Sequence, residues 1–340
     1  MIQANVNRFI QFSAPKRAEM QTEPVAEPKA GEVLVQTACS AVSAGTELLV
    51  YRGDLPDSMQ LDATIEDLKT QIDAWPVRYG YANVGRVTKL GDGVESSWEN
   101  RYVFAFNPHE SHFVAKLENL MQIPTGIDPE DAAFLPNMET AVSFVMDSRP
   151  LIGETIVVMG LGIVGQLTLK LLAQMSLGRL IGIDPVESRR NIALESGATA
   201  VFNPTDPALI DALGEGGADA VLELSGNPAA LNSAVHLAGY NGRILIGSWY
   251  GKKQAPLDLG SSFHRSNIEI FASQVSRLHP NLTGRWTKER RLEVAWKMIA
   301  KHRPSTFITH RPDVSEATAI YEMLDQRPEE ALQVLFKYDN

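Results

Sequence analysis

The first part of the chain alternates short apolar runs with turn residues. We predict strands at 33–39, 84–90, 102–106 and 112–115, separated by Gly, Pro and Asp residues. Short strands at this spacing are typical of a small barrel or sandwich. One segment differs. Between 63 and 75 the apolar residues recur at helical spacing behind Thr64, a suitable N-cap, and they predict a helix.

The middle of the chain alternates apolar strands with helices. We predict strands at 155–159, 180–183, 200–202, 219–224, 243–247 and 268–272, and helices at 163–175, 187–196 and 227–238. Strands that are apolar throughout and joined by crossover helices indicate a parallel sheet covered on both faces. The last region has helical patterns at 288–300 and 314–325, and it ends in a predicted strand at 331–337.

Composition narrows the class of protein. The 340 residues, 44% hydrophobic and 21% charged, are typical of a globular protein with two domains. A formal net charge of −10 without a basic patch argues against a nucleic-acid partner. The basic stretch 285–291 is interpreted as solvated surface. We see no apolar segment of a signal peptide or membrane span, so we expect a cytoplasmic protein without a membrane partner.

Cysteine and histidine limit the possible metal sites. Cys39 is the only cysteine, so an intrachain disulfide and any metal site with two Cys ligands are impossible. His109 and His112 lie close together, but positions three apart point to opposite sides of a strand. A wet cleft wall or a hydrogen-bonded loop is therefore the preferred interpretation of these two residues.

The strongest motif follows the predicted strand 155–159 and opens the predicted helix 163–175. It is the G-x-G-x-x-G run Gly160-Leu161-Gly162-Ile163-Val164-Gly165. In a dinucleotide-binding turn of this kind, Gly160 permits the tight turn, Gly162 lets the backbone approach a pyrophosphate, and Gly165 lets the helix pack close to the sheet. The first N–H groups of the helix then face the phosphates. We predict that all six residues bind the cofactor.

An acidic residue at the end of the next strand indicates which dinucleotide binds. Asp184 follows Gly165 at the spacing expected for a carboxylate that accepts hydrogen bonds from the ribose hydroxyls and repels a 2′-phosphate. We therefore predict NAD rather than NADP as the cofactor. Arg189, which we include in the site, and Arg190 follow closely and would soften this preference. The alternative is a Gly-rich turn that binds nothing.

Three segments of the first region resemble the medium-chain dehydrogenase/reductase superfamily. Residues 28–35 are similar to its opening P-x-x-G-E-V-L-V, and residues 43–47 and 79–87 occupy the places of C-G-T-D and G-H-E-x-x-G-x-V. The resemblance covers nearly the whole chain. It implies an α/β fold in which a GroES-like β-rich catalytic domain (1–127) is interrupted by a Rossmann domain with a doubly wound parallel sheet (128–272) and completed by 273–340. It also implies an active site in the cleft between the two domains.

The zinc ligands of that superfamily are missing. Ala44 replaces the ligand Cys, Tyr81 replaces the ligand His, and Ala82 replaces the Glu beside it. Residues 134–138 offer no Cys, Asp or Glu, and the structural zinc lobe would need four cysteines. We predict a zinc-independent member with no metal site. The chain is most similar to a subgroup labelled after bacteriochlorophyllide dehydrogenase or as threonine-dehydrogenase-like proteins.

Without zinc, another group must handle the substrate oxygen. The resemblance places Thr46 where family members hold a hydroxyl against that oxygen, although it is also suitable as a barrel-loop turn residue. Tyr81 either donates a hydrogen bond there or simply fills the vacated metal site. Glu47 completes the candidate catalytic set, although its counterpart usually has a structural role. Leu49 occupies the place of a proton-relaying His, so this relay is absent.

Further cofactor contacts are expected at the carboxyl ends of the parallel strands, where ligands bind such sheets. The loops after the fourth, fifth and sixth strands carry Ser225, Gly247 with Ser248, and Ser273. The resemblance adds Thr140, which lies where the family contacts the nicotinamide side.

These observations favour an NAD(H)-dependent oxidoreductase that transfers a hydride between a secondary alcohol or carbonyl and nicotinamide. A reductase of C=C bonds, as in quinone or enoyl reductases, is a second hypothesis, but those enzymes mostly prefer NADPH. A third is a non-catalytic dinucleotide-binding sensor or partner protein. The expected partners are a small-molecule substrate and a second copy of the chain, paired through the edge of the Rossmann sheet.

Overall fold

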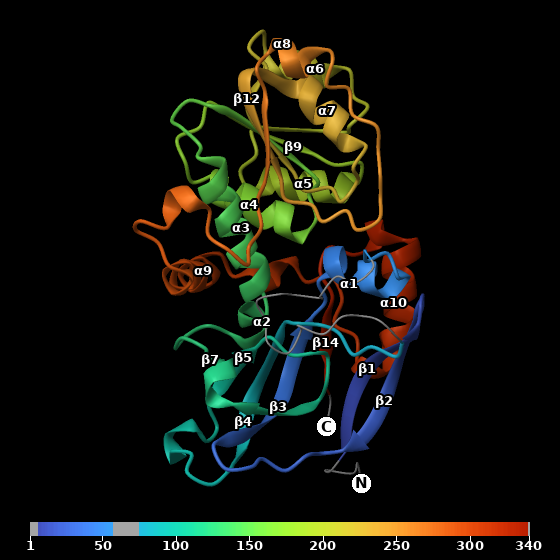
Figure 1. Ribbon diagram of the computed structural model, residues 1–340, viewed down its shortest axis with the longest axis vertical. Helices are drawn as coiled ribbons and strands as arrows, with labels where there is room; N and C mark the ends of the chain where they lie inside the picture. The colour runs from blue at the N-terminus through green and yellow to red at the C-terminus, as the bar shows by residue number, and fades with distance from the viewer. Residues whose placement is uncertain (1–5, 57–74, 339–340) are drawn as a thin grey trace. The chain divides into compact units, whose positions relative to one another are not determined.

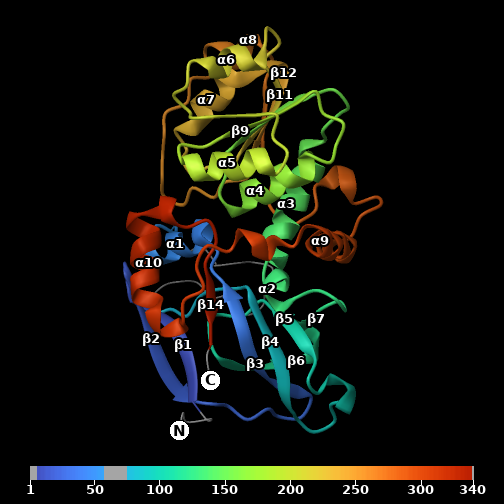
Figure 2. The same ribbon diagram turned by 180° about the vertical axis from the view of Figure 1, so that it is seen from behind.

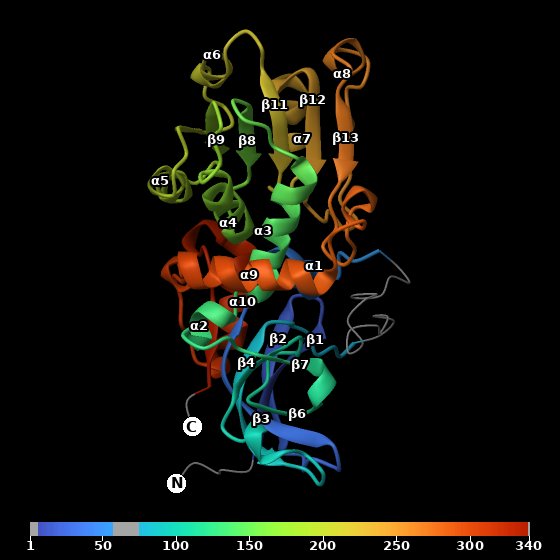
Figure 3. The same cartoon turned by 90° about the vertical axis from the view of Figure 1, so that its left-hand side faces the viewer.

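The segments predicted as parallel strands form a six-stranded parallel sheet. Its order is β10-β9-β8-β11-β12-β13, and Figure 3 shows most of these strands side by side. The strands are β8 (Thr155–Met159), β9 (Arg179–Ile183), β10 (Ala200–Phe202), β11 (Ala218–Glu223), β12 (Ala238–Ile246) and β13 (Glu269–Ala272). This is the order of a doubly wound sheet, with successive strands added outward on either side of β8 and β11.

Alternating apolar residues of these strands pack against helices on both faces of the sheet. Ile156 and Val158 share one core with α3 (Leu135–Ser148), α4 (Ile163–Leu172) and α5 (Glu187–Glu195). Val157 and Met159 share the other core with α6 (Ala208–Leu213) and α7 (Ala230–Leu237). Short α8 (Ser262–Arg265) precedes β13. The two-residue period of β8 therefore explains why it is apolar at each position from 156 to 159.

A second sheet, largely antiparallel, is built from segments of both ends of the chain (Figure 1). Its order is β14-β3-β4-β5-β7, with β6 paired to β3, and β1 and β2 form a separate hairpin. The strands are β1 (Val6–Ala14), β2 (Arg17–Pro24), β3 (Glu32–Ala41), β4 (Asn83–Leu90), β5 (Tyr102–Ala105), β6 (His112–Lys116), β7 (Leu120–Gln122) and β14 (Leu335–Lys337). Inward-facing Val33, Val35, Val87 and Val103 form its core.

Helices close a second core beside the β1–β2 hairpin. α10 (Ala317–Gln326) contacts both β2 and α1 (Ala44–Arg52), and Figures 1 and 2 show it beside the hairpin from opposite sides. Phe12, Tyr51 and Tyr321 form its aromatic centre, with ring centroids 5.0–5.9 Å apart. The remaining helices are α2 (Pro129–Ala132) and α9 (Lys288–His302).

The computed structural model describes residues 6–56 and 75–338, and the chain divides into two compact units. The first unit is Met1–Pro136 with Trp296–Asn340, and the second is Asn137–Ala295. The α/β fold with a split β-rich unit and a Rossmann-like sheet is therefore confirmed. The units divide at 136/137 and 295/296, whereas the sequence-based boundaries lie at 127/128 and 272/273. No helix within the described ranges is long and apolar enough to cross a membrane.

Individual elements differ from the prediction in informative ways. The predicted helix at 63–75 lies outside the described residues except for its last position. Thr46, for which a barrel-loop turn was the alternative interpretation, lies in α1. The predicted strand 331–337 shrinks to β14, and a 3-10 turn at 328–330 precedes this segment. Arg291, interpreted as solvated surface, is only 2% exposed and pairs with Glu139, so that interpretation was wrong for this residue.

Candidate functional site

The Gly-rich turn joins β8 to α4 in a conformation that only glycine fits. Gly160 has φ of +92°, and a Cβ on it would lie 2.5 Å from the backbone of Ser225. A Cβ on Gly165 would lie 2.0 Å from the carbonyl oxygen of Gly160. The predicted reasons for these two glycines, a tight turn and close packing of the helix, are confirmed. A Cβ on Gly162 meets nothing within 4 Å, so the turn is open at that position.

Asp184 follows β9 and is tied to this turn. Its Oδ2 accepts the N–H of Leu161 at 2.8 Å, and its Oδ1 accepts the N–H of Val186 at 2.8 Å. The residue is 4% exposed. A carboxylate offers about four acceptor positions, so these two bonds leave capacity for hydroxyl donors of a ligand.

Two arginines follow Asp184, and their contacts differ. Arg190 Nη1 donates to the carbonyl oxygens of Asp184 and Pro185 at 2.7 and 2.8 Å. The carbonyl of Arg189 accepts Nε2 of Gln166, a buried residue of α4, at 2.7 Å. The backbone at and after the acidic residue thus binds the guanidinium of Arg190, whereas Arg189 was the residue included in the predicted site.

A pocket of about 210 Å³ lies at the ends of β8 and β9. Met159 and Ile183, the residues directly before Gly160 and Asp184, form part of its wall. The other apolar lining residues are Pro204, Leu209, Ile210 and Leu237. Sequence reasoning missed this pocket. Its walls come from separate strands and helices, so no single segment of the sequence indicates it. Pro204, shortly after β10, is the one lining residue that marks a turn.

The loops after β11 and β12 meet at a buried carboxylate. Glu223 is fully buried, and its Oε1 accepts the N–H of Ser225 at 2.8 Å and the hydroxyl of the same residue. Its Oε2 accepts the hydroxyl of Tyr250. Burial, and then the hydrogen bond to Glu223, raises the pKa of Tyr250 above its ordinary value. The Ser248 hydroxyl accepts the N–H of Gly226 at 2.9 Å and joins the two loops.

The other predicted cofactor residues lie in different surroundings. The Ser273 hydroxyl donates to Asp147 on α3 at 2.6 Å. Thr140 is half-buried on the same helix. Gly247 allows close packing, since a Cβ there would lie 2.4 Å from the ring of Phe144. The structure thus gives Ser273 and Gly247 contacts within the second unit.

In the first unit, the predicted oxygen-handling residues lie around the start of α1. Thr46 is half-buried in the first turn of this helix. The phenol of half-buried Tyr81 donates to the hydroxyl of Ser43, the N-cap residue of α1. Tyr81 and Ser43 thus form a hydroxyl pair at the helix start. Ser43 was quoted in the motif, but its contact with Tyr81 could not be predicted from sequence.

Glu47 is fully buried below this hydroxyl pair. Its Oε1 accepts the N–H of Ser43 at 2.7 Å. Its Oε2 accepts the hydroxyl of Tyr321 at 2.5 Å and lies 3.1 Å from Nε2 of His109. Burial, and then the charge of Glu47, raises the pKa of Tyr321 well above its ordinary value, so the phenol stays a donor. Glu47 therefore links α1 to two distant segments of the first unit.

His109 is 0% exposed and fully surrounded by the first unit. Its Nδ1 lies 2.7 Å from the hydroxyl of Ser40, which in turn lies 2.7 Å from the hydroxyl of Tyr338. The ring also packs against Gly80, where a Cβ would lie 2.6 Å from Cδ2 of His109. The hydrogen-bonded loop predicted for His109 is confirmed, and the alternative of a wet cleft wall was wrong.

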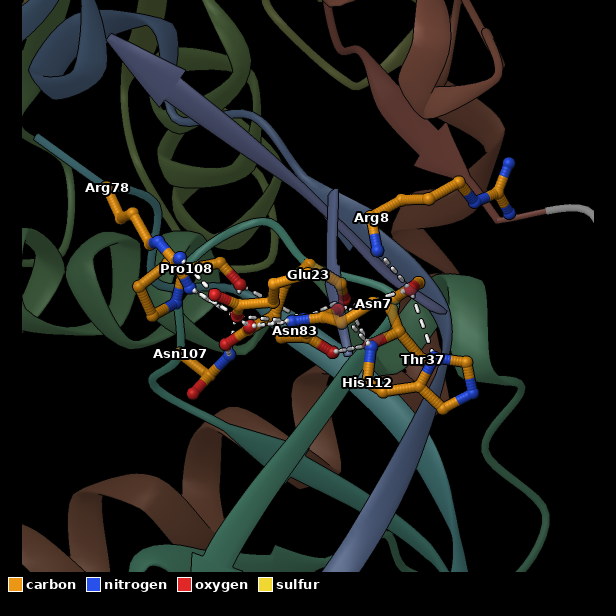
Figure 4. A network of polar contacts seen from close by, with 11 residues as sticks. Asn7, Arg8, Glu23, Thr37, Arg78, Asn83, Asn107, Pro108 and His112 are labelled. Carbon is orange, nitrogen blue, oxygen red and sulfur yellow. Dashed lines mark hydrogen bonds and ion pairs between the residues drawn. The ribbon is translucent and has the colours of Figure 1, made fainter. Parts of the chain in front are cut away.

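The loop that carries His109 is fixed by the polar network shown in Figure 4. The carboxylate of Glu110 accepts Nδ2 of Asn7 and of Asn107, each at 2.8 Å. Its carbonyl oxygen accepts the hydroxyl of Thr37 at 2.6 Å and Nδ2 of Asn83 at 3.3 Å. Strands β1, β3 and β4 thus hold this loop from three sides.

His112, the second histidine of the loop, contacts different partners. Its Nδ1 lies 3.0 Å from the Ser111 hydroxyl, and burial with the nearby Arg8 charge lowers its pKa. Over residues 6–56 and 75–338, no three His, Cys, Asp or Glu side chains are grouped so that they could hold a metal ion.

Comparison with known proteins gives matches along the chain. Residues 164–290 match the family model for the zinc-binding dehydrogenases. The D-guloside 3-dehydrogenase of Escherichia coli K12 is 26% identical over 324 residues, which is 90% of this chain and 92% of the relative. The L-threonine 3-dehydrogenase of Pyrococcus furiosus is 26% identical over 270 residues, which is 69% of this chain and 74% of the relative.

Solved structures share the fold over almost the full length. A protein from E. coli CFT073, described as a short chain alcohol dehydrogenase and complexed with NADH, superimposes with a TM-score of 0.77 at 18% identity, covering 98% and 100% of the two chains. A zinc-binding dehydrogenase from Sinorhizobium meliloti 1021, bound to NADP, gives 0.76 at 17% identity, covering 98% and 99%. Together with the fold, these matches support the resemblance of the chain to the medium-chain dehydrogenase/reductase superfamily.

Proposed function

We propose that this chain is an NAD(H)-dependent, zinc-independent dehydrogenase that transfers a hydride between a secondary alcohol, or its carbonyl, and nicotinamide. The dehydrogenase assignment follows the relatives. Two of them are named for oxidation at carbon 3 of a guloside and of L-threonine, where the hydroxyl is secondary. The proposed substrate is accordingly a polar small molecule with a secondary hydroxyl group.

The second unit fits a dinucleotide. The open backbone at Gly162 and the start of α4 would hold the pyrophosphate, and Asp184 would accept the ribose hydroxyls. The apolar pocket beside Asp184 would hold the adenine. When bound, the nicotinamide supplies the hydride acceptor or donor. The placement of the open turn, the buried carboxylate and the pocket beside one another is the observation that carries the proposal.

NAD is preferred to NADP because Asp184 would oppose a 2′-phosphate. The guanidinium of Arg190, which lies against the Asp184 and Pro185 carbonyls, would soften this opposition. Structures with NADH and with NADP exist among proteins of the same fold, so the fold itself permits either cofactor.

The residues of the first unit do not fit a catalytic zinc. Ala44 offers no ligand, and the Tyr81 phenol is bonded to Ser43. Cys39 is buried on β3, where burial raises the pKa of its thiol to about 12, whereas zinc binds the thiolate. We therefore derive no step that involves a metal.

The hydroxyl groups of Tyr81 and Thr46 are the proposed partners of the substrate oxygen. Alcohol oxidation leaves a proton to be accepted from that oxygen, and carbonyl reduction requires one to be donated to it. The Ser43–Tyr81 bond orients the phenol, and a donor fixed in this way stabilises charge on the oxygen without reorganising during the reaction.

The test is a turnover assay with NAD⁺ or NADP⁺ and a panel containing methyl D-guloside, L-threonine and 2,3-butanediol. We expect reduced nicotinamide to form with NAD⁺, unchanged after dialysis against a chelator, and less than stoichiometric zinc by mass spectrometry. The variants Tyr81→Phe and Thr46→Val should lower kcat by about 10²-fold or more, while NADH binding stays unchanged. Reduction of enoyl or quinone substrates instead would favour the C=C reductase, and NADH binding without turnover would favour the non-catalytic protein.

We also propose a cytoplasmic homodimer that joins through β13. Within the described chain this edge strand pairs only with β12, and Leu257 and Leu259 are 40% and 44% exposed in the segment before it. Exposed strand edges and apolar side chains are suited to pairing with a second copy. Sedimentation analysis should give twice the chain mass, and a Leu257→Lys variant should give the monomer.

A further inference from the structure

We propose that His109 is a positioning residue for the hydroxyl pair of Ser43 and Tyr81. The inference rests on the proposed function, because Tyr81 is one of its proposed oxygen-handling groups. His109 is completely buried and therefore cannot touch a substrate. Its effect must pass through the residues that its ring contacts.

The first path runs through Glu47. Nε2 of His109 lies 3.1 Å from Oε2 of Glu47, whose Oε1 accepts the N–H of Ser43 at 2.7 Å. Tyr321 donates to the same Oε2 and has no other role in the proposed reaction. Because Oε2 is held by two groups, the carboxylate has one orientation, and this orientation fixes the backbone of Ser43. The Ser43 hydroxyl then receives the phenol of Tyr81.

The second path runs through Gly80, the residue before Tyr81. Gly80 has φ of +126°, and the His109 ring occupies the space that a Cβ would need, 2.6 Å from Cδ2. The ring thus packs directly against the backbone that precedes and positions Tyr81. One buried imidazole therefore acts on both members of the hydroxyl pair, on Ser43 through Glu47 and on Tyr81 through Gly80.

The hydrogen-bond directions are consistent along this network. The carboxylate of Glu47 only accepts, so Nε2 of His109 carries the hydrogen in that contact. With a neutral ring, Nδ1 then accepts the hydroxyl of Ser40, which accepts the hydroxyl of Tyr338. A ring of this tautomer presents a donor edge to Glu47 and an acceptor edge to Ser40.

The contributions of the Nε2 and Nδ1 sides of His109 can be measured separately with Gln and Asn. Both carry a side-chain amide, but the Gln side chain is longer. His109→Gln retains an N–H donor near the position of Nε2, and His109→Asn retains a polar group only near Nδ1. We expect kcat of the Asn variant to be about tenfold or more below that of the Gln variant, since a hydrogen bond to a charged group is lost. A merely structural role predicts equal losses in both. Tyr321→Phe, a milder change, should also lower kcat. His112→Gln, at the start of β6, is the matched control.

Amide hydrogen exchange at Ser43 decides the proposal even without a substrate. We expect faster exchange in His109→Asn and Tyr321→Phe, and near wild-type exchange in His109→Gln and His112→Gln. Unchanged exchange in both of the first two variants would overturn the proposal. Absence of turnover in the wild type would instead defeat the proposed function, while the exchange experiment would still show whether His109 holds Ser43.

Discussion

The carboxylate of Asp184 accepts the amide N–H of Leu161 at 2.8 Å, so the acidic residue after β9 is bonded to the middle of the Gly-rich turn. One side chain thereby connects the proposed ribose site with the proposed pyrophosphate site. The bond also accounts for its burial at 4% exposure, because a carboxylate that is removed from water needs hydrogen-bond donors.

We expect Asp184→Ala to weaken NADH binding about tenfold to a hundredfold, since hydrogen bonds to a charged group contribute about 1.5–3 kcal/mol. NADPH binding should weaken less or improve, because the negative charge that opposes a 2′-phosphate is removed. Fluorescence titrations with both nucleotides measure the change. Asp211→Asn, on the exposed face of α6, serves as the control. A larger loss for NADPH than for NADH would contradict the proposed role.

Two glycines of the turn offer a matched pair of substitutions. A Cβ on Gly165 would overlap the carbonyl oxygen of Gly160, whereas one on Gly162 meets nothing within 4 Å. Gly165→Ala should therefore lower the free energy of unfolding by about 1–3 kcal/mol. Gly162→Ala should leave stability nearly unchanged and yet weaken NADH binding, because the methyl group occupies the approach of the phosphate. Denaturant unfolding and NADH titration of both variants check this, and NADH binding by Gly162→Ala at wild-type strength would place the phosphate elsewhere.

The second unit could be predicted closely from sequence because its signals are local. The strand at 155–159, the turn and the helix are consecutive, and β8 has the predicted bounds. The pocket lined by Met159, Ile183 and Pro204 could not be predicted, because these residues come from three different strand ends. The buried Arg291 was also missed, since its charge indicates a surface residue until Glu139, far away in sequence, is known to be its partner.

In the first unit, the strands could be predicted, but the hydrogen-bonded contacts around the candidate catalytic residues could not. No helix was predicted around Thr46 and Glu47, yet residues 44–52 form α1, whose Leu48 and Val50 are buried in the core that includes α10. The network of Glu47, His109 and Tyr321 joins three segments separated by 62 and 274 positions. No periodicity or motif of a single sequence carries contacts of this kind.

The buried ion pair of Glu139 and Arg291 should contribute strongly to the stability of the second unit. Their side chains are 4% and 2% exposed, and Nη2 lies 2.7 Å from Oε1. Removing one partner leaves a buried charge, so Arg291→Met should cost about 3–5 kcal/mol of unfolding free energy. The double variant Glu139→Met/Arg291→Met should recover part of that loss. Arg149→Met, which removes an exposed pair with Glu269, should change stability by less than about 1 kcal/mol. Equal losses for Arg291→Met and Arg149→Met would contradict this prediction.

The network around the His109 loop makes a prediction about pH. Burial raises the pKa of Glu110 above its ordinary value, although Asn107 and Asn7 donate to it. A carboxyl with a raised pKa in the folded chain adds stability below its unfolded pKa and loses it as pH rises through the folded pKa. The unfolding free energy of the wild type, relative to Glu110→Gln, should therefore fall as pH rises above about 4.3, the ordinary pKa of Glu.

Glu23, in the same network, should show the opposite dependence on pH. Two hydrogen bonds from Arg78 lower its pKa, so its contribution is present above the unfolded pKa and is lost as pH falls through the folded pKa. The wild type should gain stability relative to Glu23→Gln as pH rises from the acid side to about 4.3, the ordinary pKa of Glu. Urea unfolding of the three proteins at several pH values measures both slopes. A rise in the stability of the wild type relative to Glu110→Gln with increasing pH would show that the burial of Glu110 does not outweigh its two amide donors.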